Sequence, residues 1–182
     1  MGKTYEQLDE KLAAFIEAQK VFFVATAPLS AEGHINLSPK GYDAFRILDP
    51  KTVAYLDTGG SGIETQAHTQ ENGRITIMFC AFEGAPVILR LYGRATATQW
   101  NEDGFDALLA QFPKFDKARA IFTIKLDRIQ DSCGWGVPLM AFEGDREQLK
   151  RFLDNPKMSA DDWAEKRYKG NATSIDGLPG VR

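Results

Sequence analysis

The stretch of residues 87–98 constrains the fold more than any other part of this sequence. Its odd positions from Val87 to Ala95 carry apolar or small residues, and its even positions include Arg90 and Arg94. Alternation with a period of two residues, with one apolar and one cationic face, is typical of a half-buried antiparallel strand. Residues 120–129 alternate in the same way. The sequence therefore predicts antiparallel β structure.

Shorter patterns predict the other elements. Four more β-rich runs lie between turn residues, at 21–27, 34–40, 52–57 and 74–79. Helical spacing and capping signals predict five helices, at 4–19 (opened by a Thr4–Gln7 capping box), 63–70, 101–112, 145–153 and 160–169.

The order of these elements predicts the architecture. The strands follow one another through mostly short connections, without a βαβ rhythm, which favours an antiparallel barrel over a doubly wound sheet. We expect a mainly β fold with flanking helices, a six-stranded antiparallel barrel. No repeat or low-complexity linker divides the chain, so residues 1–182 form one predicted domain, with a C-terminal helical extension over about 143–182.

Composition excludes several classes of function. A net charge of −3 disfavours nucleic acid or an anionic membrane as the main partner, because both require a concentrated basic surface. Two cysteines do not make a secreted disulfide framework, and with only His34 and His68 besides they supply a zinc site poorly. We expect these histidines on a loop edge and a helix surface. No apolar run reaches membrane-spanning length, and no secretory signal is present, so a cytoplasmic location is expected.

A glycine-rich loop is the strongest local signal for a ligand. Residues 54–65 read as a strand, a turn with three glycines and the start of a helix. Glycines permit close backbone approach, and the first N–H groups of a helix are free donors at its positive end, so a phosphate fits there. Alternatively, Ser61 and Glu64 form a capping box that satisfies the same N–H groups, and Glu64 repels a phosphate. Both interpretations are open.

Two further segments have ligand-binding features. Ser38 and Lys40 point to one side of an extended chain, while Pro39 interrupts the hydrogen-bond ladder and predicts an edge strand. They make either an anion site or a solvated lysine beside a structural proline. Trp135 lies between two glycines, where it can stack on an aromatic ring or anchor a turn. Cys133 precedes it, but nothing indicates a lowered thiol pKa there, so no catalytic role is assigned.

These segments occur in an order that resembles a known family. Ser-Pro-Lys-Gly (38–41), Gly-Ser-Gly-Ile-Glu-Thr (60–65), Asn-Gly-Arg-Ile-Thr (72–76) and Cys-Gly-Trp-Gly-Val-Pro (133–138) precede a closing segment at 171–180. The set resembles the pyridoxamine 5′-phosphate oxidase-related FMN-binding split β-barrel family over nearly the whole chain. The resemblance implies a split barrel that forms a homodimer with FMN at the subunit interface.

The same resemblance assigns most of the candidate cofactor residues. It places the flavin beside the second strand, the ribityl chain and phosphate beside the third strand and its loop, and a tryptophan across the subunit interface. Arg74 is added from its position at the head of the fourth predicted strand. The candidates are Ser38, Pro39, Lys40, Leu56, Asp57, Ser61, Gly62, Arg74 and Trp135.

Two departures separate this chain from authentic pyridoxamine phosphate oxidases. Those enzymes offer an Arg-Lys pair to the FMN phosphate close to where this chain has Gly62 and Ile63, and an Arg-Leu-His triplet to the vitamin phosphate where it has residues 137–140, Val-Pro-Leu-Met. Phosphate binding must then depend on backbone N–H groups, Lys40 and one or more arginines. Without the triplet the substrate loses its charge-assisted hydrogen bonds, so we predict that this chain is not a vitamin B6 oxidase.

Two classes of function fit this reading. The first is an FMN-dependent oxidoreductase with a small-molecule substrate, in which the flavin carries the redox chemistry and no acid or base side chain is required. The second is a non-catalytic binder of flavin, deazaflavin or haem, because the fold does not fix the function. The sequence assigns neither a catalytic residue nor a substrate, and it indicates no metal.

Overall fold

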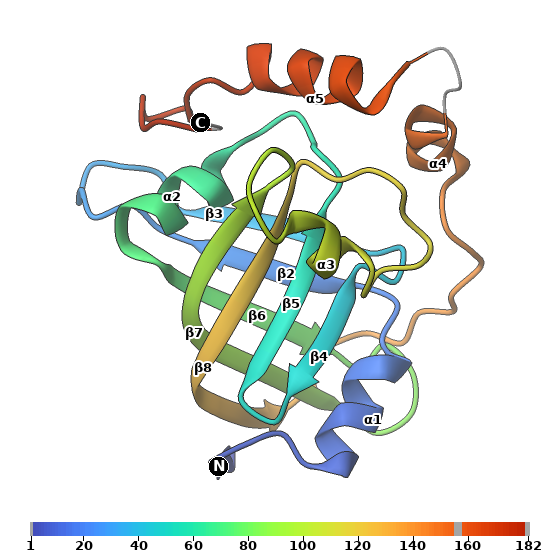
Figure 1. Cartoon of the computed structure of the whole chain (residues 1–182). Coiled ribbons are helices and arrows are strands. Elements are labelled where there is room, and N and C mark those ends of the chain that lie inside the picture. The colour runs from blue at the N-terminus through green and yellow to red at the C-terminus, as the bar shows by residue number, and fades with distance from the viewer. Residues whose placement is uncertain (1, 155–157, 181–182) are drawn as a thin grey trace.

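The computed structural model describes residues 2–154 and 158–180 and is mainly β, as predicted. Within that part, one antiparallel sheet has the strand order β3-β2-β6-β7-β8-β5-β4, with the short β1 paired to β8 (Figure 1). The strands are β1 Thr4–Tyr5, β2 Phe22–Thr26, β3 Asn36–Lys40, β4 Phe45–Asp49, β5 Thr52–Asp57, β6 Arg74–Cys80, β7 Val87–Gln99 and β8 Ala120–Cys133. The helices are α1 Glu10–Ala18, α2 Glu64–Asn72, α3 Phe105–Leu109, α4 Glu147–Leu153 and α5 Ala160–Lys169.

The two long strands β7 and β8 form the centre of the sheet, and their alternation is confirmed. Leu89 and Leu91 of β7 and Ile124 of β8 are fully buried, whereas Arg94 is exposed. The register shifts near Tyr92, where β8 contains one extra residue. The apolar face predicted from the sequence is therefore the inner face of the curled sheet.

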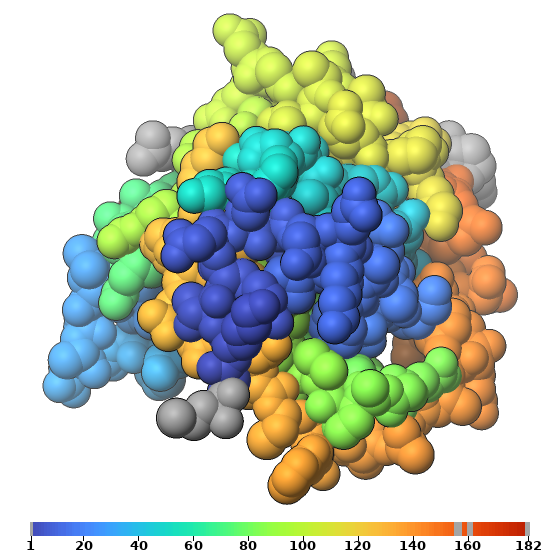
Figure 2. Space-filling view, turned by 90° about the horizontal axis from the view of Figure 1, so that it is seen from below, coloured from blue at the N-terminus to red at the C-terminus, as the bar shows by residue number. Residues whose placement is uncertain are grey.

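Aromatic side chains fill one part of the core. Phe22 contacts Phe45 and Phe79 at centroid distances of 5.2 and 5.7 Å, and Tyr55 stacks on Phe122 at 4.8 Å. Helix α1 packs its apolar side chains into this cluster. Figure 2, seen from below, shows the N-terminal part of the chain covering this end of the barrel. The buried side chains of α1 are Leu12 and Ile16, and Leu8 of the preceding turn is buried with them.

The count of strands differs from the predicted six. Thr4 and Tyr5, expected to open the first helix in a capping box, instead pair with β8, where the Tyr5 hydroxyl donates to Asp131 at 2.6 Å. Helix α1 begins at Glu10, because the Asp9 side chain caps it by accepting from the Leu12 N–H. The capping box at Thr4 was therefore wrong. The other additional strand, β4, is a short edge strand that no pattern in the sequence predicted.

The C-terminal segment lies across the opposite end of the barrel from α1. Figure 1 shows α5 lying across this end of the barrel, with the segment that follows it ending close to α2. Long-range hydrogen bonds fasten the segment, among them those from Gln70 to the Gly180 carbonyl, from the Ile175 N–H to Glu64, and between His34 and Asp176. The ends of the described chain thus lie on opposite sides of the barrel, and the predicted C-terminal helices are present.

The described residues contain neither a membrane-spanning helix nor a disulfide bond. No helix in that part of the chain combines the length and apolar character needed to cross a bilayer. Cys80 is buried and Cys133 is exposed, and both are free thiols.

Candidate functional site

Helix α2 begins without a side-chain cap. Its N-cap is Ile63, whose apolar side chain makes no capping hydrogen bond. The capping box, one of the two interpretations that the sequence left open, does not form, because the N-cap is Ile63, Ser61 is exposed in the loop and Glu64 accepts from the Ile175 N–H at 3.3 Å. The positive end of α2 is therefore directed at loop 58–63 with its N–H groups uncapped by side chains, which is the arrangement that favours an anion.

A buried ion pair supports this loop from below. The Asp57 carboxylate at the end of β5 accepts two hydrogen bonds from the Arg119 guanidinium, at 2.7 and 3.0 Å, and both side chains are almost fully buried. Arg119 also donates to the Gly62 carbonyl at 2.9 Å, and Asp57 accepts from the Gly59 N–H at 3.1 Å. The pair thus fixes both ends of the loop.

The charge of Asp57 is maintained by more than one cation. Burial acts to raise its pKa, but the positive charges of Arg119 and Lys40 outweigh burial and hold the pKa of Asp57 below its usual range. Lys40, at the end of edge strand β3, therefore lies within electrostatic reach of Asp57 at the end of β5. Two strands that are distant in the sheet order thus bring opposite charges to this end of the barrel.

Helix α5 brings a further cation to the loop. The aliphatic part of Arg167 and the ring of Trp163 lie 3.2–3.3 Å from the Cβ position at Gly59, whose φ of +73° favours glycine. The Arg167 guanidinium stacks over Phe152 at 4.2 Å. Burial and the charge of Arg119 both lower the pKa of Arg167, whereas Asp57 acts to raise it. Arg119 and Arg167 therefore act on the same carboxylate.

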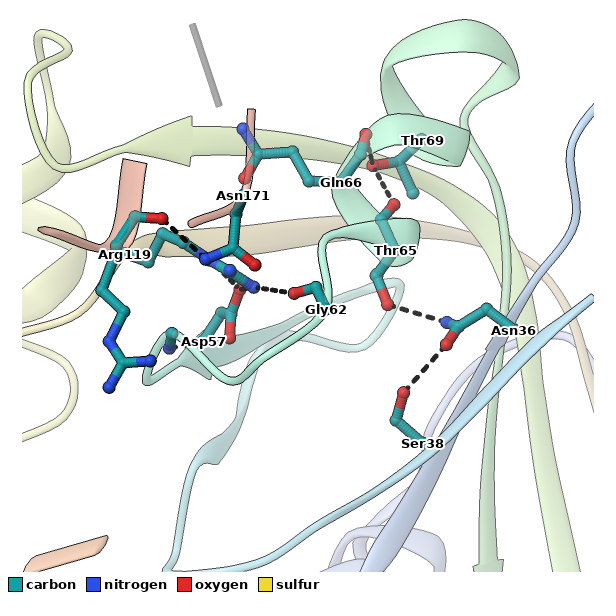
Figure 3. Close-up of polar contacts among 11 residues, drawn as sticks. Asn36, Ser38, Asp57, Gly62, Thr65, Gln66, Thr69, Arg119 and Asn171 are labelled. Atoms are coloured by element: carbon teal, nitrogen blue, oxygen red, sulfur yellow. Dashed lines mark hydrogen bonds and ion pairs between the residues drawn. The ribbon is translucent and has the colours of Figure 1, made fainter. Parts of the chain in front are cut away.

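Several buried polar atoms beside α2 have no hydrogen-bond partner within the described part of the chain. They include both amide atoms of Gln66, which is 1% exposed, Nη1 of Arg119, Nε of Arg167 and Oδ1 of Asn171. Figure 3 shows Gln66, Asn171 and the Arg119–Asp57 pair grouped around the start of α2. Buried polar groups are normally satisfied. The Gln66 amide nitrogen and the two guanidinium nitrogens are donors, and together with the excess positive charge they fit a bound anion, whereas the two amide oxygens are acceptors that an anion leaves unpaired.

A chain of hydrogen bonds connects α2 to β3 on the other side of the loop. Ser38 donates to Asn36 at 3.1 Å, and the Asn36 amide donates to Thr65 at 2.9 Å and to Thr26 at 3.1 Å (Figure 3). Ser38 and Lys40 are half-buried on one face of β3, whereas Pro39 is exposed on the other. The predicted edge strand with Ser38 and Lys40 on one side is therefore confirmed.

The structure brings most, but not all, of the predicted residues together. Leu56 is buried beneath the loop next to Asp57, and Ser61 and Gly62 lie in the loop itself. Arg74 lies elsewhere, since its guanidinium donates to the Pro28 carbonyl and to Asn72, and it lines a separate cavity of about 380 Å³ with Tyr92 and Arg94. Its role at the cofactor remains a prediction without support from this placement.

Trp135 belongs to an exposed apolar arm, residues 134–142. Trp135 is 85% exposed, and Leu139, Met140 and Phe142 are also exposed. Exposed apolar clusters of this kind are typical of interaction surfaces. Within one chain most of the Trp135 surface is therefore uncovered.

The two histidines differ from one another. His34 is exposed and pairs with Asp176 at 2.7 Å, as expected for a loop. His68, expected on the helix surface, is fully buried, and its Nδ1 lies 3.0 Å from the Thr26 hydroxyl. The error arose because α2 packs its polar face, including Gln66 and Thr69, against the barrel. No group of three or more potential metal ligands forms among the described residues.

The residues that sequence reasoning missed are Arg119, Arg167, Asn36, Thr65 and Gln66. Arg119 had a usable signal, since it lies between Ala118 and Ala120 at the start of an apolar strand, and a cation there must be paired. Arg167 had none, because arginine is ordinary on a surface helix.

Comparisons with known proteins agree with this geometry. The family model described as pyridoxamine 5′-phosphate oxidase matches residues 8–133. The pyridoxamine 5′-phosphate oxidase family protein ustO of Aspergillus flavus is 35% identical over 97% of this chain and 77% of its own length. The chain therefore belongs to the pyridoxamine 5′-phosphate oxidase family.

Solved structures share the fold. HupZ of Group A Streptococcus is 26% identical, with a TM-score of 0.56 over 68% of this chain and 98% of its own. A candidate pyridoxamine 5′-phosphate oxidase of Lactobacillus delbrueckii is 17% identical, with a TM-score of 0.51 over 69% of this chain and 94% of its own, which shows the fold alone. The split-barrel architecture is thus shared, and helices α4 and α5 lie beyond the family match.

Proposed function

We propose that this chain binds FMN with the phosphate at the start of helix α2 and acts as an FMN-dependent oxidoreductase. The observation that carries the proposal is the uncapped start of α2, beside buried donors of Arg119 and Gln66 that have no partner among the described residues. A phosphate fits both the positive end of the helix and the excess of cations over carboxylates around Asp57. Membership of the family supports the choice of a flavin.

We also propose a homodimer that encloses the flavin between its subunits. The apolar arm 134–142 supports this, because its four large side chains have too little cover within one chain. In such a dimer, Trp135 of one copy stacks against the flavin held by the other. Light scattering tests the assembly, and a monomer that binds FMN with full affinity would contradict it.

When bound, FMN supplies the electron and hydride transfer. The chain's own residues bind and orient the cofactor: Lys40 neutralises negative charge, and Ser38 and Thr65, linked through Asn36, hold β3 to α2. The test is anaerobic mixing of the yellow protein with NADH or NADPH. Rapid bleaching of the flavin absorbance supports an oxidoreductase.

A non-catalytic flavin carrier, or a binder of deazaflavin or haem, is the second candidate. Its support is the fold, which does not by itself fix a function. Asp57 is paired with Arg119 and Glu64 accepts from the Ile175 N–H, which fits either candidate because hydride transfer by a flavin requires no acid or base side chain. Flavin that binds tightly but is not reduced by either nicotinamide supports this candidate. A Soret absorbance band would indicate haem instead.

A further inference from the structure

The C-terminal segment is built closely onto the glycine-rich loop. A Cβ at Gly180 would lie 2.3 Å from the Asn171 carbonyl oxygen and 2.8 Å from the Ile63 side chain, so the tail packs directly on the side chain of Ile63, the N-cap residue of α2. Trp163 is buried, and its ring lies against Gly59. The segment is therefore part of the same packed unit as the loop, although it lies outside the family match at residues 8–133.

This segment adds the positive charge of Arg167, which forms no ion pair within the described part of the chain. Arg119 and Arg167 are both within electrostatic reach of Asp57, and Lys40 is a third cation near the same carboxylate. Glu64 is the other carboxylate close to the loop, and it accepts from the Ile175 N–H. A second guanidinium beside a satisfied ion pair is unfavourable unless an anion joins the group.

The unpaired atoms of the two arginines indicate what joins them. Nη1 of Arg119 and Nε of Arg167 are buried and have no hydrogen-bond partner in the described part of the chain. Guanidinium groups bind phosphate through paired, charge-assisted hydrogen bonds. The stem of Arg167 is held by Gly59 and its guanidinium by Phe152, so its orientation is set before any ligand arrives.

We propose that Arg167 of α5, together with Arg119, binds the FMN phosphate, so that the C-terminal segment completes the cofactor site. The proposal rests on the proposed function. It assigns to these two arginines the part that an Arg-Lys pair in the loop would otherwise play, where this chain has Gly62 and Ile63. Arg167 is a specificity residue in this account: it distinguishes FMN from riboflavin, which has no phosphate.

The test is to titrate the full-length protein and its R167Q variant with FMN and with riboflavin, following flavin fluorescence. We expect R167Q to weaken FMN binding by about tenfold or more and to leave riboflavin binding unchanged, because only FMN carries the phosphate. R167K, which keeps the charge but not the fork of donors, should lose less. The matched control is K166Q on the exposed face of the same helix, which should change neither affinity.

The possible outcomes separate this inference from the proposed function. Unchanged FMN affinity in R167Q, with both flavins still bound, overturns the role of Arg167 and leaves FMN binding intact. Equal weakening for FMN and riboflavin overturns it too, because it shows a structural effect of α5 rather than a phosphate contact. If the unmodified protein binds neither flavin, the proposed function fails and this inference fails with it.

Discussion

Two aspartates of this chain are each held by an arginine at nearly the same distance, yet their surroundings differ. Asp57 and Arg119 approach to 2.7 Å with side chains 5% and 6% exposed, whereas Asp43 and Arg46 approach to 2.9 Å with side chains 45% and 23% exposed. Water and ions screen the second pair but hardly reach the first. Similar geometry therefore does not imply similar energy.

The two ion pairs also differ in what they hold in place. The Asp57–Arg119 pair holds the Gly59 N–H and the Gly62 carbonyl, and so shapes the loop at the proposed phosphate site. The Asp43–Arg46 pair is local, because the two residues lie three positions apart at the start of β4. Lys114 is a second partner of Asp43, at 3.0 Å. We therefore expect the buried pair to govern both stability and ligand binding, and the exposed pair to govern neither.

The largest expected effect follows from removing the buried carboxylate. D57A should lower the free energy of unfolding by about 3–5 kcal/mol, because Arg119 is left buried without its counter-charge. Urea denaturation of the unliganded protein measures this. Replacing both partners, as in D57L with R119M, should restore much of the loss. If D57A lowered the free energy of unfolding by less than about 1 kcal/mol, the contrast between the two ion pairs would be refuted.

The next largest effect is expected at Trp135, which is exposed in the single chain and should be covered in the proposed dimer. W135A should weaken FMN binding by about 2 kcal/mol or more, as for an aromatic anchor at the centre of an interface, and leave the monomer fold intact. Flavin fluorescence gives the affinity and circular dichroism the fold. The neighbouring V137A is a suitable control, since Val137 is less exposed and contains no ring. Retention of flavin by W135A would show that the arm does not reach the cofactor.

Lys40 of edge strand β3 acts on the buried pair through its positive charge, which helps to lower the pKa of Asp57. K40A should weaken FMN binding by about 1.5–3 kcal/mol, the value of one charge-assisted contact. K51A, in the exposed turn between β4 and β5, is the matched control and should have no effect. Titration with FMN decides between them, and an unchanged dissociation constant for K40A would remove Lys40 from the site.

The smallest effect is expected at the exposed pair. D43N should lower the free energy of unfolding by no more than about 1 kcal/mol and leave FMN affinity unchanged, because exposed ion pairs contribute little. The measurement is the same urea titration used for D57A. A loss comparable to that of D57A would mean that distance, not burial, determines the strength of these pairs.

The sequence predicted the regular parts of the sheet because local pattern and tertiary packing agree there. Strand β5 and helix α5 occur at the residues expected, and β3 is an edge strand as Pro39 indicated. The start of the chain failed because pairing with β8 and the hydrogen bond to Asp131 outweigh the local capping signal at Thr4. Long-range pairing of this kind has no local signature.

The site was predicted in part for a similar reason. The loop and β3 are marked by glycines and by the Ser38–Lys40 pattern, both of which are local. The cations that meet at Asp57 are not: Arg119 is 62 positions further along the chain, and Arg167 lies in a helix whose sequence resembles any surface helix. Burial of Arg119 is fixed by the closure of the sheet, which no window of sequence contains.

The absorbance spectrum of the purified protein, with the mass of the small molecule released on denaturation, tests the central claim most directly. The account predicts the two visible absorbance bands of an oxidised flavin and a released mass equal to that of FMN. A colourless protein that also fails to bind added FMN would contradict the account, as would a released ligand without a phosphate.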